Sequence, residues 1–232
     1  MESKTGIEPL NGVPQSLVDR VSHAVRGAIL EGRLRPGEGL SISDLAADLG
    51  VSQSPVREAL QRLSGEGLVV LRPARTAIVA PLELDDLKEI YRLRGLLEVD
   101  AVARSASKFA EADIAVLTNE LEAMAQADPN TDEFWARHSA FHTALMKPVL
   151  NPRLERMINE LWGAGQRYIR IVYLETDALR TRSPRERHEP LLDAAVLGDT
   201  RTLRKALAEH LQMNEREIVK ALETVMADAK LA

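Results

Sequence analysis

The sequence predicts a mainly α-helical protein in two parts. Residues 14–82 are expected to form three helices and a β-hairpin, and residues 83–230 an all-α bundle of about six helices. Three observations support this. Apolar residues recur at helical spacing along most of the chain. Only residues 68–82 are rich in β-branched residues in two short runs. After Pro81 the helix-favouring residues Ala, Leu, Glu and Arg dominate.

The composition limits what this chain can be. Its 232 residues are enough for two small domains, and its hydrophobic content of 45% is that of an ordinary globular protein. It has no Cys, which excludes disulfides and thiolate metal sites. No apolar run approaches the roughly 18 residues that span a bilayer, and the first residues lack a secretion pattern. We therefore expect a cytoplasmic location and no membrane partner. The net charge of −5, with nearly balanced charges in the N-terminal part, is compatible with DNA binding but does not predict it.

The N-terminal part is expected to contain three helices before its hairpin. A first helix covers residues 17–30, and residues 34–40 form a Pro/Gly turn. Ser41 begins the capping sequence of a short second helix, which Gly50 ends. The third helix follows residues 51–54 and directs one apolar face inward, formed by Val56, Leu60 and Leu63. A Pro-Ala-Arg-Thr turn then joins the two β-branched runs into the hairpin.

The remainder of the chain predicts helices only. Their approximate ranges are 84–108, 111–127, 131–147, 151–177, 184–197 and 200–229. The fifth of these has a full capping box, with Ser183 as the cap, Pro184 at the first position and Glu186 at the third. Gly198 ends it.

Two short helices joined by a tight turn and followed by a hairpin make a winged helix-turn-helix. This fold inserts one helix into the major groove of DNA, and residues in the first turns of that helix read the bases. Here those turns carry residues 52–57, in which Arg57 suits guanine and Gln53 suits adenine. The alternative is that the pattern reflects three packed helices without a DNA partner. The candidate DNA contacts are Arg35, Ser52, Gln53, Ser54, Arg57, Arg62, Arg75 and Thr76.

Residues 32–69, GRLRPGEGLSISDLAADLGVSQSPVREALQRLSGEGLV, closely resemble the DNA-binding domain of the GntR family of bacterial regulators. The resemblance runs from about Leu17 to Leu82. It implies binding to double-stranded operator DNA, with Arg57 of PVREAL as the best contact. Two features depart from the family: residues 74–76 read Ala-Arg-Thr where Asn-Arg-Gly is frequent, and Gln53 stands where Arg is frequent. The operator sequence is therefore not fixed by the resemblance.

Four of the five histidines lie in the predicted bundle. His138 and His142 are four positions apart, so both imidazoles lie on one helix face at about 5–6 Å between Cβ atoms, which suits metal chelation. His188 lies in the first turn of the fifth bundle helix and His210 within the sixth. A bundle can bring side chains from three helices to one interior point. The alternative is that these histidines are ordinary surface or core residues. His23 stands alone in the first helix.

Three segments resemble the FCD domain, the all-helical effector domain of the FadR-type branch of the GntR family. They are RLRGLLEVDAVARSA, HSAFHTALM with NPRLERM, and RERHEPLLDAAVLGDTRTLRKALAEHL. The resemblance covers about residues 87–222. It implies a divalent metal bound by His138, His142, His188 and His210. His138 departs from the family, which usually has an acid or amide there. Loss of an oxygen donor favours zinc or nickel, with cobalt and copper also suitable, over manganese or magnesium.

A metal held by neutral imidazoles keeps its charge of +2 and attracts a carboxylate to an open coordination position. By resemblance Arg94 faces this cavity and grips a small organic acid effector, with Arg167 and Arg170 as further candidates. The alternative for Arg94 is a helix-surface ion pair with Glu98, four positions later.

Three classes of function follow. The first is a metabolite-responsive repressor that binds an inverted repeat as a homodimer. The second is a metal-responsive regulator, in which the divalent metal is itself the effector. The third is an enzyme. We expect no enzyme, because the sequence contains no HExxH motif, no Ser/His/Asp spacing and no Gly-rich phosphate loop.

Overall fold

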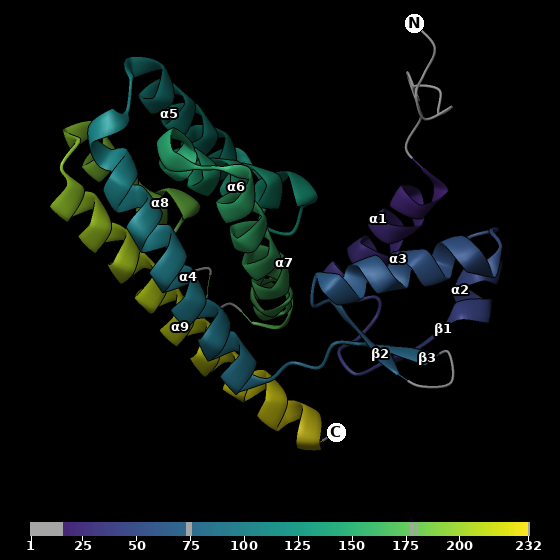
Figure 1. Cartoon of the computed structure of the whole chain (residues 1–232). Helices are drawn as coiled ribbons and strands as arrows, with labels where there is room; N and C mark the ends of the chain where they lie inside the picture. The colour runs from purple at the N-terminus through teal and green to yellow at the C-terminus, as the bar shows by residue number, and fades with distance from the viewer. Residues whose placement is uncertain (1–15, 73–75, 177–178, 180, 232) are drawn as a thin grey trace, which may run out of the picture. The chain divides into compact units, whose positions relative to one another are not determined.

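The computed structural model describes residues 16–72, 76–176, 179 and 181–231, with side chains as far as residue 227 (Figure 1). The chain divides into two compact units. The first comprises residues 1–29 and 33–80, and the second comprises residues 30–32 and 81–232. No helix in the described ranges is long and apolar enough to cross a membrane.

Three helices form the first unit around a small core. They are α1 (Leu17–Leu30), α2 (Ile42–Asp48) and α3 (Gln53–Gly65). The apolar face predicted for α3 is confirmed, because Val56, Leu60 and Leu63 are all buried. The predicted cap of α2 is also confirmed, since Ser41 Oγ accepts a hydrogen bond from the backbone N–H of Asp44. A bidentate ion pair between Arg26 and Glu66 joins α1 to the residue that follows α3.

The first unit also contains a sheet with one more strand than the sequence predicted. The hairpin is β2 (Val69–Arg72) and β3 (Thr76–Val79), and β1 (Gly39–Ser41) pairs antiparallel with the free side of β3. Residues 34–40 were expected to be only a turn, so β1 is a correction. It is three residues long with one buried apolar side chain, Leu40, which is too short for an alternating pattern. Gly37, at φ +79°, provides the left-handed turn that brings β1 to β3.

The second unit is helical throughout its described residues. Its elements are α4 (Leu84–Ser105), η1 (Ala106–Lys108), α5 (Glu111–Gln126), α6 (Asp132–Met146), η2 (Lys147–Val149), α7 (Pro152–Glu175), α8 (Pro184–Leu197) and α9 (Thr200–Leu231). The long helices α4 and α9 lie side by side, and α7 packs against both (Figure 1). Helix α5 packs against α6 and α8. Side chains from all six helices meet in one apolar core.

Local capping chemistry sets most helix boundaries in the second unit. Asn151 Oδ1 accepts hydrogen bonds from the first backbone amides of α7. Ser183 and Glu186 form the capping box predicted for α8, and Gly198 ends that helix at φ +65°. The predicted first bundle helix, about 84–108, is instead α4 followed by the single 3₁₀ turn η1. These boundaries orient α6, α8 and α9 so that their histidines face inward.

Candidate functional site

The first turn of α3 carries most of the candidate DNA contacts. Ser52 is the N-cap residue but makes no side-chain capping bond, so the first amides of α3 keep free donors. Ser52, Gln53 and Ser54 are exposed, and Arg57 is half-buried one turn later. Arg57 forms no ion pair with any residue that the structure describes. This arrangement suits contacts to phosphates and base edges.

The remaining candidates lie around this helix or outside the described residues. Arg62, one turn further along α3, forms an ion pair with Asp19 of α1. Arg35 is exposed in the turn before β1, and Thr76 is exposed at the start of β3. Arg75 lies outside the described residues.

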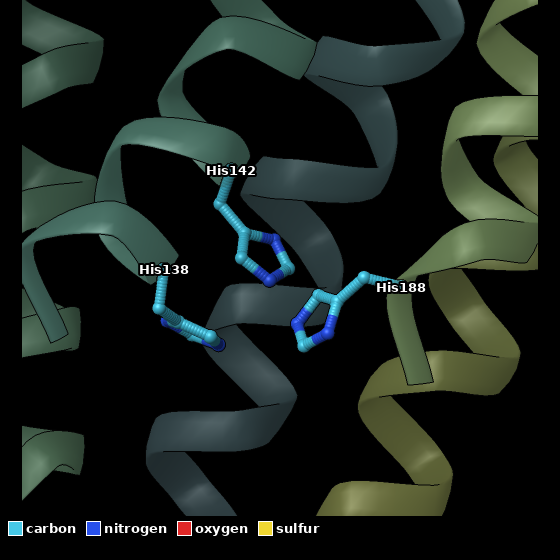
Figure 2. Close-up of side chains that lie close together, drawn as sticks. All are labelled: His138, His142 and His188. Carbon is cyan, nitrogen blue, oxygen red and sulfur yellow. The ribbon is translucent and has the colours of Figure 1, made fainter. Parts of the chain in front are cut away.

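Three helices bring the four bundle histidines together. His138 and His142 project from α6 toward His188 on α8 (Figure 2). The ligand nitrogens of these three side chains lie within 4.8 Å of one another. His210 on α9 is adjacent, with its ring centroid 4.7 Å from that of His188 and 5.2 Å from that of His142. The structure therefore brings three histidines into metal-binding range, with the fourth beside them.

Backbone carbonyl groups orient two of these rings. His188 Nδ1 lies 2.7 Å from the carbonyl oxygen of Pro184, and His210 Nδ1 lies 3.1 Å from that of Arg187. A carbonyl can only accept, so both Nδ1 atoms carry the proton and each Nε2 presents a lone pair. The lone pair of His210 accepts a hydrogen bond from the Asn214 amide at 3.0 Å. Hydrogen bonds of this kind commonly orient metal-ligating histidines.

The other imidazole nitrogens fit a metal. His142 Nε2 and His188 Nε2 are buried without a hydrogen-bond partner in the described part of the chain. A buried polar atom without a partner lowers the stability of the folded protein by about 1–3 kcal/mol. A ligand that binds such an atom removes this penalty. Two orphaned nitrogens that converge with His138 are what a bound cation would satisfy. The donor set therefore fits a divalent transition metal.

Burial keeps the cluster uncharged. It lowers the pKa of His188 from 6.5 to about 4. It also lowers the pKa values of His138, His142 and His210 well below 6.5, with further lowering by neighbouring imidazoles and by the positive charge of Arg94. Neutral imidazole is the form that binds metal, so the cluster is ready for a cation at neutral pH.

Arg94 lies inside the bundle. Its Nε donates to Glu98 Oε1 at 2.6 Å, and both side chains are at least 95% buried. Trp162 Nε1 donates to the same carboxylate oxygen at 2.8 Å, and the Trp162 ring lies 5.7 Å from that of His142. The ion pair that the sequence offered as an alternative for Arg94 therefore exists, but in the interior and not on the helix surface. Arg94 is thus beside the histidine cluster and already paired.

Arg167 and Arg170 lie on α7 and pair with residues of other segments. Arg167 donates to Asp86 Oδ2 at 2.6 Å and to the carbonyl oxygen of Pro81 at 3.0 Å. Arg170 pairs with Asp132 at 2.7 Å, and its guanidinium lies 5.4 Å from the centre of the Trp135 ring. Neither side chain lines the cavity beside His138 and His188.

Sequence reasoning missed Arg187 and Asn214. Both line the cavity beside His138 and His188. Arg187 is buried and pairs with Glu217 at 2.6 Å. That partner is 30 positions away on another helix, so no local spacing indicates the pair. Asn214 is one turn after His210 on α9, and this i,i+4 spacing was the available signal for it.

Comparison with known proteins decides the family. Residues 17–79 match the family model described as bacterial regulatory proteins, gntR family, and residues 89–213 match the FCD domain. The chain belongs to the GntR family. As in other members with this architecture, a winged helix-turn-helix is followed by an all-helical FCD domain, which confirms the predicted fold class.

Relatives of this GntR protein regulate transcription. The HTH-type transcriptional regulator McbR of Escherichia coli K12 is 32% identical over 204 residues, which cover 86% of this chain and 91% of McbR. The transcriptional repressor GlaR of the same organism is 30% identical over 197 residues, covering 81% and 89%. This GntR protein is a DNA-binding transcriptional regulator and not an enzyme, as the sequence predicted.

Solved structures agree with the fold of this GntR protein. The structure of E. coli McbR/YncC superimposes with a TM-score of 0.71 at 30% identity and covers 89% of this chain and 99% of that one. A GntR regulator of Rhodococcus sp. RHA1 gives a TM-score of 0.72 at 27% identity, with 88% and 98% covered.

Proposed function

We propose that this GntR-family regulator is a metabolite-responsive repressor. In the proposal it binds an inverted-repeat operator as a homodimer, and a small carboxylate bound at a divalent metal in the FCD domain controls that binding. The observation that carries the proposal is the convergence of His138, His142 and His188 with two orphaned buried Nε2 atoms. The name of GlaR supports the choice of repressor over activator.

In the proposed homodimer, α3 of each protomer binds one half-site of a two-fold operator. A two-fold protein reads a two-fold site, with one recognition helix per half-site. Arg57 contacts guanine, and the exposed residues Ser52, Gln53 and Ser54 contact phosphates or bases. Secondary contacts to the DNA backbone come from Arg35, Arg62, Arg75 and Thr76.

On the effector side, the proposed metal is zinc or nickel. His138, His142 and His188 would hold it. His210 could join them if the Asn214 amide stopped donating its hydrogen bond to His210 Nε2. The metal supplies an electrophilic position for a carboxylate. Arg94 adds positive charge beside the cluster, as its effect on the histidine pKa values indicates.

Helix α7 is the proposed route from the cluster to the DNA-binding unit. Tyr168 Oη donates to Asp86 Oδ2 at 2.6 Å and accepts from the backbone N–H of Glu83, while Arg167 bonds Asp86 and Pro81. These bonds tie residues 81–86, which follow the first unit directly, to α7. The same helix carries Trp162, which contacts His142. We propose that a ligand at the cluster shifts α7 and, with it, the segment of residues 81–86. Arg167 transmits this shift through its bonds to Pro81 and Asp86. Arg170 holds the start of α6 through Asp132.

Metal analysis of the purified protein tests the site. The proposal predicts close to one zinc or nickel per chain in wild type and almost none in the double variant His142→Ala/His188→Ala. His23→Ala is the matched control, because His23 is exposed in the first unit. Equal metal content in all three proteins would refute the site. If metal alone changed operator affinity and no carboxylate did, the protein would be the metal-responsive regulator instead.

A further inference from the structure

A small cavity adjoins the histidine cluster. It is bounded by His138 and His188 and has a volume of about 40 Å³. One water needs roughly 10–15 Å³ on this measure, so the space suits a ligand of a few heavy atoms. Its walls are mainly aromatic and aliphatic side chains, among them Phe134, Trp135, Ile169, Tyr173, Leu179 and Ile218.

The guanidinium and amide side chains on the cavity wall are Arg187 and Asn214, and both have protein partners. Arg187 donates to Glu217 at 2.6 Å and to the carbonyl oxygen of Leu179 at 3.1 Å. The Asn214 amide donates to His210. Arg187 keeps one unused donor, because its Nε is buried without a partner in the described ranges. Beyond the imidazoles, Arg187 is therefore the charged donor on this wall that suits an anion, while most of the remaining wall is aromatic or aliphatic.

From this lining we infer the chemical class of the effector, and the inference rests on the proposed function. We propose that it is a short, apolar monocarboxylate. Its carboxylate lies at the polar end, between the cluster and Arg187 Nε, and its hydrocarbon part lies against the aromatic and aliphatic wall. A hydroxyl or second carboxylate on that part would lose its hydration without gaining a partner, which the cavity penalises.

Two isosteric acids test this class. Butyrate and 3-hydroxypropionate differ only in a terminal methyl or hydroxyl group. Isothermal titration of the zinc-loaded protein is expected to give a Kd for butyrate lower than that for 3-hydroxypropionate by at least about tenfold. Equal affinities, or tighter 3-hydroxypropionate, would overturn the inference.

Two further outcomes separate this inference from the proposed function. Binding of succinate with no binding of butyrate would overturn the apolar class and leave a metal-anchored carboxylate effector standing. A protein that holds no metal and binds none of these acids would overturn both.

A wall variant locates the hydrocarbon part. Ile169 is half-buried on the cavity wall, and Ile169→Thr gives the wall a hydroxyl. The affinity ratio of the two acids is expected to fall by about threefold or more. Ile114→Thr is the control, since Ile114 is half-buried on α5 outside the cavity. The ratio is insensitive to a general loss of stability, and an unchanged ratio in Ile169→Thr would overturn the assignment.

A paired variant tests the carboxylate end. Arg187→Met with Glu217→Gln removes the ion pair without leaving either charge alone. It is expected to weaken butyrate binding by about tenfold while zinc content stays at the wild-type level. The control removes an exposed pair on the same helix, with Arg185→Met and Glu189→Gln. Butyrate affinity that falls equally in both variants, or in neither, would contradict the role of Arg187.

Discussion

At the scale of single residues, the proposed metal site of the FCD domain depends on the Nε2 atoms of His142 and His188. Both are buried, and neither has a partner among the described residues. Their rings are held by apolar packing and, for His188, by the carbonyl oxygen of Pro184. An unfilled site of this kind is destabilising, and a bound cation converts the same atoms into a stabilising contact.

Acid sensitivity of the metal-free protein follows from these imidazoles. The folded-state pKa of His188 is about 4, below the ordinary 6.5, so the unfolded state binds the proton more tightly. Its contribution to stability is complete above pH 6.5 and is lost as pH falls toward 4. We expect the contribution of His188 to the unfolding free energy to fall by roughly 1–2 kcal/mol between pH 6.5 and about 5, before most carboxylates titrate, and the other three imidazoles act in the same direction.

Urea unfolding of chelator-treated protein across this pH range measures the effect. His188→Phe, which removes the titrating group, is expected to show a flatter pH dependence. Identical pH profiles for wild type and variant would contradict the assignment of the loss to His188.

A second residue-scale prediction concerns operator binding by Arg57. Arg57→Ala is expected to weaken binding to a selected operator duplex by about 10–100-fold, since a bidentate base contact contributes roughly 1–3 kcal/mol. The fold should persist, because the side chain forms no ion pair in the described part of the chain. Fluorescence anisotropy measures the affinity. Arg153→Ala, an exposed position on α7, controls for the lost charge. Operator affinity that was the same in both variants would exclude Arg57 as a base contact.

Residue spacing predicted only those site contacts whose two residues lie close together in the sequence. The i,i+4 spacing of His138 and His142 indicated that they share one site, and the same spacing indicated the ion pair of Arg94 with Glu98. The partners of Arg167, Arg170 and Arg187 are 30 to 81 positions away, so their ion pairs depend on helix packing that no local pattern encodes. The spacing of Arg94 and Glu98 indicated their ion pair but not that the pair is buried, for the same reason.

At the scale of elements, boundaries followed capping chemistry and were largely predictable. Ser41, Ser183 and Gly198 are found at the helix ends where the sequence indicated them. The exception is β1, whose pairing with β3 rests on a Pro/Gly turn and one buried leucine. Strands this short are stabilised by their neighbour and not by their own sequence pattern.

The contact between α7 and the start of α4 gives a prediction at this scale. Tyr168→Phe removes the hydroxyl that bonds Asp86 and Glu83. We expect a loss of about 0.5–1.5 kcal/mol in unfolding free energy. Metal content and carboxylate affinity should be unchanged, while the effect of the carboxylate on operator binding should diminish. Parallel titration calorimetry and anisotropy check this. An undiminished operator response would show that α7 is not the route.

At the scale of the whole molecule, the chain combines a DNA-reading unit with a helical sensor unit. The family, the fold class and the regulatory role were accessible from sequence because motif identity extends over most of both domains. A small organic acid effector was predicted from the resemblance, but the apolar character now proposed for it was not accessible, since the cavity wall is assembled from four helices and the residues before α8.

We propose above all that a carboxylate at the histidine-bound metal controls operator binding. The most direct test is the operator Kd of the zinc-loaded protein, measured by anisotropy with and without saturating butyrate on a duplex selected from a random pool. We expect a change in operator Kd within the usual allosteric range of about 5–150-fold, which disappears when a chelator removes the metal. An operator Kd that stays the same with every carboxylate bound by the zinc-loaded protein would contradict control of operator binding by the carboxylate.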